Sequence, residues 1–499
     1  MSTPDEAAHD EALTAPGAGH RAIRGGVIRV AGYGAALLLT ALVTPFLLRH
    51  LGVTQFGRYT TVVAIVSMVQ GLTDAGLTVV GQRIYVHADA VRRRTLLADL
   101  VGIRLVLTPL GIAVGVLFTV VAGYPNAIVT GTILAGIGVV LAVVAASLAM
   151  PLSIELRLGA VTAIDFFRQL TLVVGIVALV IVGAGLVPFL ALYIPAGMVA
   201  VVAALAFLGP SSWVAPRFSW SEWKPLLREA LPVALSNMVN TTYVRALVIL
   251  CSLLASAEQT GLFSTSYRVS EILLGVPMML MGAVFPILAH AHVASHDRLA
   301  YVLQRMGEAT LLLGMALGLV LAVGADPIVE LLGGSQFEGA ADALRIQSIA
   351  IAGAFMTQLG TAALIAVERP RMLLLVNLVA LVTVIVLGVT LIPLWGANGA
   401  ALAASIGEVV LAIATLTLLT RAHPALRPDL RYVPKLLLAA GVGALCILLP
   451  IPAVLATVGA VVVYTAIAWL LRAVPVELIE ALVLRRSLDA ATEKPGTAD

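Results

Sequence analysis

The sequence predicts an all-α polytopic membrane protein with fourteen transmembrane helices, and two observations carry this prediction. Of the 499 residues, 60% are hydrophobic and only 11% are charged, whereas soluble proteins average about 25% charged residues. The apolar residues also form continuous runs of about 20, the length that a helix needs to cross the hydrocarbon core of a bilayer. A membrane barrel would show short alternating segments instead, so both observations favour a helical bundle.

Glycine, proline and charged residues divide the apolar sequence into the fourteen predicted spans. The first span follows a polar stretch and is longer than the apolar region of a cleaved signal peptide, so we expect it to be retained. The polar ends of the chain, 1–24 and 485–499, are expected to be disordered. The spans are expected at 26–48, 57–80, 97–121, 126–150, 160–182, 186–208, 231–254, 262–289, 305–323, 343–366, 372–393, 398–420, 433–450 and 453–471.

Basic residues concentrate on one side of the predicted spans. If the N-terminus is cytoplasmic, most of the 30 Lys and Arg residues fall in cytoplasmic segments or in the adjoining helix ends, which is the positive-inside pattern. We therefore expect both termini in the cytoplasm and the protein in the plasma membrane, or in the inner membrane of a cell with two membranes. The formal net charge of +3 is too small to indicate a nucleic-acid partner.

The two halves of the chain share features at a nearly constant offset. A shift of 204 residues places Gly57 on Gly261, at the starts of the second and eighth spans. Duplicated halves in transporters usually enclose the substrate route, so we expect two pseudo-symmetric six-helix lobes followed by an appended helix pair. The expected parts are a cytoplasmic end at 1–24, an N-lobe at 25–208, a cytoplasmic linker at 209–230, a C-lobe at 231–420, a helix pair at 421–484 and a cytoplasmic tail at 485–499.

Small residues and turn residues predict two local features. G-x-x-x-G pairs occur at Gly111 and Gly115 in the third span and at Gly314 and Gly318 in the ninth, and such pairs are typical of close packing between membrane helices. The connection at 325–342 is the longest on the outer side, and it contains a proline and a Gly-Gly pair. These residues predict a short interfacial helix followed by a turn.

Several short motifs follow one another along most of the chain. They include L-G-V-T-Q-F-G-R-Y at 51–59, D-A-G-L at 74–77, L-R-E-A-L-P at 227–232, G-L-F-S at 261–264 and P-L-W-G-A-N-G-A-A at 393–401. In this order and spacing they resemble the polysaccharide flippase family of the multidrug/oligosaccharidyl-lipid/polysaccharide (MOP) superfamily, which is related to the lipid II flippase.

The resemblance implies a transporter without enzymatic activity or a cofactor. Its two lobes would alternate between inward-open and outward-open states around a polar cavity and move a polyprenyl-pyrophosphate-linked saccharide to the outer leaflet. The sugar, the coupling ion and the presence of a polysaccharide polymerase or ligase as a partner stay open. In the family an acidic residue often closely follows the basic residue of the seventh span, whereas here Arg245 is followed by Ala246, Leu247 and Val248, which puts a coupling role for such an acid in doubt.

A polar stripe in the seventh span is the first candidate for the cavity wall. Asn237, Thr241 and Arg245 recur every four residues, with Asn240 beside them, so they share one helix face. A charge near the bilayer centre costs about 2.5–3.5 kcal/mol, which makes it a functional candidate. Since the planar guanidinium fork matches phosphate oxygens, we expect this face to bind the pyrophosphate.

Three further intramembrane arginines allow more than one interpretation. Arg268 in the eighth span could bind the same pyrophosphate, or it could form a structural ion pair with Glu271 three residues later. Arg104 could also face the cavity, but its position near a helix start favours snorkelling to the cytoplasmic interface. Arg168 has Asp165 three residues before it, so pairing together with snorkelling is the favoured interpretation.

Acidic residues in the spans are the candidates for ion coupling. Asp74 is the clearest of them, although neutralising Arg83 or capping the adjacent loop is the favoured alternative. Glu408 could couple, line the cavity or pair across helices. Arg24 and Arg29 near the first span could attract the anionic head group to the cytoplasmic mouth, or they could serve as helix-flanking anchors.

Other function classes compete with a flippase. A membrane glycosyltransferase or polymerase usually needs a sizeable external loop with acids or bases, and no nucleotide-binding motif accompanies the lysines. An ion-coupled multidrug or cation exporter of the same superfamily generally has twelve helices and an acidic cavity, and a structural membrane protein would not need the polar stripe. The two cysteines are far apart within apolar runs and indicate neither a metal site nor a disulfide.

Overall fold

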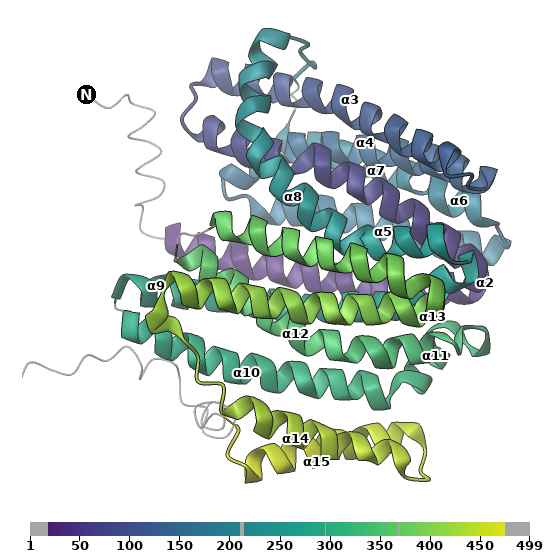
Figure 1. The fold of residues 1–499 in the computed structure, drawn as a ribbon. Helices are drawn as coiled ribbons and strands as arrows, with labels where there is room; N and C mark the ends of the chain where they lie inside the picture. The colour runs from purple at the N-terminus through teal and green to yellow at the C-terminus, as the bar shows by residue number, and fades with distance from the viewer. Residues whose placement is uncertain (1–17, 210–213, 295, 368–369, 475–499) are drawn as a thin grey trace, which may run out of the picture. The chain divides into compact units, whose positions relative to one another are not determined.

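Every element of regular structure in the described residues is helical (Figure 1). The computed structural model describes residues 18–209, 214–294, 296–367 and 370–474. The helices are α2 (Ala18–Val86), α3 (Ala90–Val121), α4 (Asn126–Ile154), α5 (Leu158–Val182), α6 (Leu186–Ala191), α7 (Tyr193–Leu208), α8 (Trp220–Leu254), α9 (Ala257–Ala294), α10 (His296–Val323), α11 (Ala325–Gly333), α12 (Ala340–Ala366), α13 (Pro370–Ala422), α14 (Tyr432–Ala444) and α15 (Ala453–Leu470). Three short 3-10 helices lie at Ser335–Phe337, Pro424–Leu426 and Leu445–Leu448.

Ten helices within the described residues are long and apolar enough to cross a membrane. Two of them, α2 and α13, each contain two of the predicted spans, and the helical path breaks at Gly52 (φ 71°) and Gly396 (φ 56°). Both positions need the left-handed backbone region that glycine enters without a steric penalty. The structure confirms a polytopic helical membrane protein, and the count of fourteen spans and the orientation of the termini stay predictions.

The chain forms two compact units. Unit 1 contains the described residues up to Ser264, together with Leu331–Phe337 and Ile385–Ala400, and unit 2 contains the rest of the described residues. Helices α9 and α13 therefore have residues in both units. The units are defined by contacts within the fold and the predicted lobes by sequence repetition, so the lobes at 25–208 and 231–420 stay a prediction.

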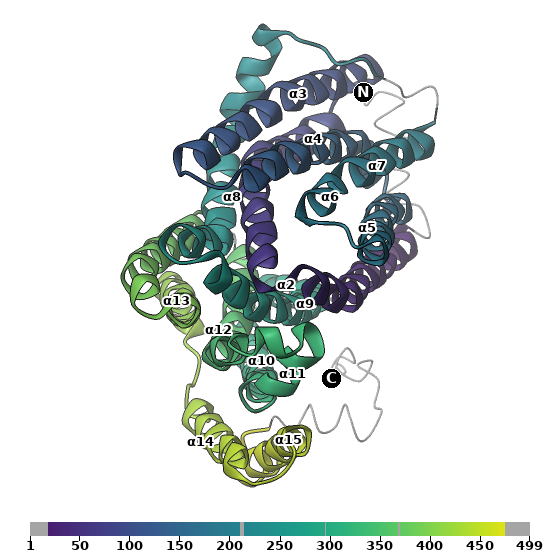
Figure 2. The same cartoon turned by 90° about the vertical axis from the view of Figure 1, so that its right-hand side faces the viewer.

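In unit 1, the helices α2, α4, α7 and α5 contact one another in a closed order, which Figure 2 shows nearly end-on. Helix α8 packs along α2, and α3 packs against both α2 and α4. Leu96, Leu100 and Ile103 of α3 are buried together with Trp223 of α8. This cluster, at the end of unit 1 predicted to be cytoplasmic, holds the start of α8 against α3.

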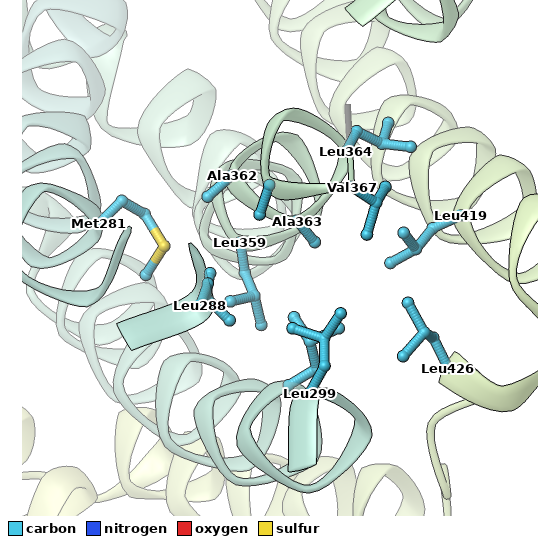
Figure 3. Close-up of a cluster of buried hydrophobic side chains, with 12 residues drawn as sticks. Met281, Leu288, Leu299, Leu359, Ala362, Ala363, Leu364, Val367, Leu419 and Leu426 are labelled. Atoms are coloured by element: carbon cyan, nitrogen blue, oxygen red, sulfur yellow. The ribbon is translucent and has the colours of Figure 1, made fainter. Parts of the chain in front are cut away.

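In unit 2, α10 packs against α12, and α14 and α15 pack against each other and against α10. Figure 3 shows a cluster of buried side chains that includes Leu299 of α10, Leu359 of α12 and Leu419 of α13. A second cluster contains Leu436 of α14 and Tyr464 of α15, whose hydroxyl donates a hydrogen bond to the Leu312 carbonyl at 2.9 Å. The C-terminal helix pair is therefore attached to unit 2 through α10.

The predicted local features are present. Gly111 and Gly115 of α3 lie against Val69 and Ile65 of α2, where added Cβ atoms would stand 2.7 and 3.2 Å from those side chains, and the second G-x-x-x-G pair lies equally close to α12. Close helix packing at both pairs is confirmed. The connection at 325–342 forms the short helix α11 and then a turn at Gly334, which has a φ of 75°.

Helices α2 and α9 cross with their backbones in contact. A Cβ added to Gly57 would lie 2.0 Å from the Ala257 carbonyl oxygen, and one added to Gly261 would lie 2.1 Å from the Val53 carbonyl oxygen. These two contacts are related by the shift of 204 residues, which also relates Thr60 to its hydrogen-bond partner Ser264, with 2.9 Å between the hydroxyl oxygens. Residues that the shift of 204 places on one another in the sequence are therefore paired across the crossing of α2 and α9.

The crossing predicts a strong response to one added methyl group. We expect Gly57→Ala to lower the free energy of unfolding by about 1–3 kcal/mol, because overpacking forces the two backbones apart. Gly459→Ala on α15 is the matched control, because nothing lies within 4 Å of its added Cβ and alanine favours a helix over glycine. Thermal unfolding of the detergent-solubilised proteins measures both, and equal melting temperatures would contradict the backbone contact.

Candidate functional site

The predicted polar stripe lies on α8 within unit 1. Asn240 is exposed, whereas Asn237, Thr241 and Arg245 are partly buried. Thr241 packs directly against Gly71 of α2, where an added Cβ would lie 2.5 Å from the threonine hydroxyl oxygen. The absence of a side chain at Gly71 therefore lets α2 approach the stripe at Thr241.

The second predicted arginine forms the ion pair that the sequence allowed. In unit 2, the Arg268 guanidinium donates a hydrogen bond to a Glu271 carboxylate oxygen at 2.8 Å, and the two side chains are 36% and 28% exposed. The pair is neutral as a whole and partly open to its surroundings. A ligand phosphate could therefore reach Arg268 by replacing Glu271, and its role in substrate binding stays a prediction.

A buried polar network holds the opposite side of α9. Ser270 donates to the side-chain oxygen of Gln347 on α12 at 2.9 Å, and the Gln347 amide donates to Ser266 at 3.1 Å. All three side chains are buried. Because successive helix residues are rotated by about 100°, Arg268 lies on the side of α9 opposite to the two serines. The network therefore turns Arg268 away from α12.

Arg104 was assigned to snorkelling at the cytoplasmic interface, and that interpretation is wrong. Its side chain is only 2% exposed and lies among α2, α3 and α4. It donates hydrogen bonds to the Thr78 and Ser147 hydroxyls and to the Val143 carbonyl. Three acceptors from two other helices surround the cation. The Arg104 side chain is therefore buried inside unit 1, where it links α3 to α2 and α4, and it does not reach the membrane interface.

A buried carboxylate escaped the sequence analysis. Asp99 of α3 is 1% exposed, and its nearest cationic group is the Arg217 guanidinium at 4.0 Å. The Arg217 backbone amide also donates to the Ala98 carbonyl at 3.1 Å. The segment before α8 is thus attached to α3 by an ion pair and a backbone hydrogen bond. An acid inside the predicted span 97–121 was the available signal.

The remaining candidates are placed as follows. Asp74, Arg24 and Arg29 lie in α2, and their side chains lie outside the described residues. Arg83, the suggested partner of Asp74, forms an ion pair with Glu229 of α8.

The last candidates are Glu408 and the predicted pair of Arg168 and Asp165. Glu408 of α13 is partly buried, with its backbone 3.3 Å from an added Cβ at Gly353 of α12. Its role stays open. On α5, Asp165 is exposed and Arg168 is partly buried, and their ion pair stays a prediction.

Comparisons with known proteins identify the family. Residues 22–292 match the model of the family described as "Polysaccharide biosynthesis protein", more than half of the chain, and residues 232–390 match the MatE family model. The chain belongs to the polysaccharide biosynthesis protein family. No curated protein matches the chain.

Solved structures agree on the fold. A lipid II flippase, MurJ, in an inward closed conformation is similar with a TM-score of 0.75 at 10% identity, covering 89% of this chain and 98% of that chain. An inward-facing multidrug resistance MATE transporter is similar with a TM-score of 0.64 at 13% identity, covering 81% and 99%. A MOP superfamily transporter from Pyrococcus furiosus has a TM-score of 0.55 at 14% identity, covering 82% and 96%. The chain therefore shares the fold of these three transport proteins.

The burial of Arg104 generates a stability prediction. We expect Arg104→Ala to lower the free energy of unfolding by about 2–5 kcal/mol, because it leaves a cavity and removes the donor from three buried acceptors. Arg168→Ala is the control, since Arg168 lies at a similar depth in α5 and is partly exposed. Thermal unfolding in detergent compares the two. Equally small effects would mean that Arg104 reaches the interface after all.

Proposed function

We propose that this protein moves a polyprenyl-pyrophosphate-linked saccharide from the cytoplasmic to the outer leaflet for cell-surface polysaccharide biosynthesis. The observation that carries the proposal is the match of residues 22–292 to the polysaccharide biosynthesis family. The lipid II flippase fold supports it, because that match covers 89% of the chain where the multidrug transporter covers 81%. The proposed cargo is a lipid-linked sugar.

Arginine chemistry supplies the anion site in this proposal. Arg245 ends the polar stripe of α8, whose Asn237, Asn240 and Thr241 offer hydrogen bonds to sugar hydroxyls. Arg268 rests in its ion pair with Glu271, which keeps a guanidinium in an apolar setting at a lower cost than an unpaired charge. An arriving pyrophosphate has more negative oxygens than a carboxylate. It would displace Glu271 and accept the hydrogen bond that Arg268 now donates to it.

Alternating access requires an outer contact that opens, and the crossing of α2 and α9 is our choice for it. It lies at the predicted outer ends of the second and eighth spans, and it joins the two helices through bare backbone and one hydroxyl pair. Such a contact leaves no side chain to interlock, so the helices can separate without repacking a core. Asp74 and Glu408 stay the proposed coupling groups, and Arg24 and Arg29 the proposed cytoplasmic attraction for the head group.

A cation exporter is the second candidate, because residues 232–390 match the MatE family. An exporter of organic cations needs acids in its cavity without neutralising cations. Here Glu271 already pairs with Arg268, and the polar stripe ends in a further arginine. This charge distribution favours an anionic cargo.

The anion site predicts the outcome of a flipping assay. In proteoliposomes loaded with a fluorescent polyprenyl-pyrophosphate disaccharide, we expect Arg245→Gln and Arg268→Gln to slow flipping at least about tenfold, because a charge-assisted hydrogen bond contributes about 1.5–3 kcal/mol and 1.4 kcal/mol is tenfold. A membrane-impermeant quencher reads the exposed label.

The matched control is Arg345→Gln. Arg345 is paired with Asp326 and Asp342 near α11, away from both candidate arginines in sequence, and we expect normal flipping from it. Transport of organic cations by the wild type in place of lipid flipping would contradict the proposal and move the protein to the exporter branch.

The outer contact predicts a reversible block. In a Cys251→Ala/Cys446→Ala background, Thr60→Cys together with Ser264→Cys places two thiols where hydroxyl oxygens are now 2.9 Å apart, near enough for a disulfide after a small adjustment. We expect oxidation to stop flipping and reduction to restore it. The single Thr60→Cys variant, which cannot cross-link, is the control. Full flipping by the oxidised pair would show that this contact does not open during transport.

A further inference from the structure

An apolar groove runs along unit 1 between α2, α3 and α8. Helices α3 and α8 both pack on α2, and they contact each other mainly through the buried cluster near the start of α8 (Figure 2). The space between them is a groove of about 940 Å³. It lies outside the predicted polar stripe, since Asn237, Asn240 and Arg245 are not among the residues that line it.

The walls of the groove are almost entirely hydrocarbon. α2 contributes Met68, Val69 and Leu72, α3 contributes Leu110 and Val114, and α8 adds further apolar residues. Leu110 and Val114 are both 60% exposed. Exposed apolar side chains on facing helices suit a ligand that is itself apolar, because contact with it removes their surface from water or replaces bulk lipid tails.

Two cations stand at one end of the groove. Lys224 and Arg228 are exposed and lie four residues apart on α8, so they share a face at the entrance. Neither forms an ion pair or a hydrogen bond with any described residue. The two neighbouring acids are already neutralised, because Glu222 pairs with Arg92 and Glu229 pairs with Arg83. The entrance therefore carries two uncompensated positive charges.

The groove extends furthest along α8. Its wall there runs from Lys224 to Ile249, whereas its wall on α2 runs from Ile65 to Leu77 and its wall on α3 from Leu107 to Phe118. At about 1.5 Å per helical residue, the wall on α8 is about 37 Å long and the walls on α2 and α3 are about 16–18 Å long. Half of a hydrocarbon core is about 15 Å, so an acyl chain of one leaflet can lie along the stretch that α2 and α3 line.

We propose that the groove binds one anionic glycerophospholipid. Its phosphate contacts Lys224 and Arg228, one acyl chain lies along α2 and α3, and the second chain stays in the bilayer. The charge at the entrance selects a negative head group. The lipid fills the space that α3 and α8 leave and so supports α8 at the end where its polar stripe begins. This inference does not depend on the proposed function.

Native mass spectrometry of the detergent-purified protein tests the proposal with phosphatidylglycerol as the probe and phosphatidylcholine as the neutral comparison. We expect one phosphatidylglycerol to bind at least about tenfold more tightly than phosphatidylcholine. We expect the Lys224→Gln/Arg228→Gln variant to lose this preference. Arg421→Gln/Arg427→Gln removes two other exposed cations that have no ion pair among the described residues and should keep the preference.

A second pair of variants tests the hydrocarbon part of the site. Val114→Trp fills the groove and should weaken phosphatidylglycerol binding, whereas Leu117→Trp, equally exposed on the same helix but outside the groove, should leave it unchanged. Equal binding of both lipids, or binding that neither the charge variant nor Val114→Trp alters, would overturn the proposal. Displacement of phosphatidylglycerol by a polyprenyl phosphate would also overturn it, because the groove would then belong to the cargo.

Discussion

The contact between α2 and α9 constrains this chain through two glycines. At Gly57 and Gly261 two helix backbones lie so close that neither position has room for a Cβ atom. Helices that carry side chains at their contact pack about 8–10 Å apart, so only glycine allows this approach. Helix α2 breaks at Gly52, shortly before this crossing, and α8 packs along α2. The groove and the polar stripe both depend on that arrangement.

The protein keeps its buried charges in two different ways. Arg104 is enclosed by hydroxyl and carbonyl acceptors from neighbouring helices, and Asp99 lies beside Arg217 under the segment that leads to α8. These groups connect elements, because leaving any of them without a partner in an apolar interior costs several kcal/mol. Arg268 and Glu271 are different, since each is partly exposed. Exposure, more than depth along the helix, separates the connecting charges from this ion pair.

Part of the candidate site followed from spacing along the helix. The shared face of Asn237, Thr241 and Arg245 is a consequence of helical periodicity, and the ion pair of Arg268 with Glu271 is a three-residue contact within one helix. Both are local, so the sequence was enough. Arg104 was misassigned because its partners Thr78 and Ser147 are remote in the sequence, and depth along a single helix contains no information about them.

The sequence by itself determined the helical class, the membrane location, the close glycine contacts and the family, because each follows from local composition, periodicity or ordered motifs. Only the tertiary structure decided which charged side chains are buried and that Asp99 lies beside Arg217, which is far from it in the sequence. It also decided that α3 and α8 leave an apolar groove with two cations at its entrance. Those features arise where helices distant in the sequence meet, and burial is a property of the assembled neighbours rather than of the residue.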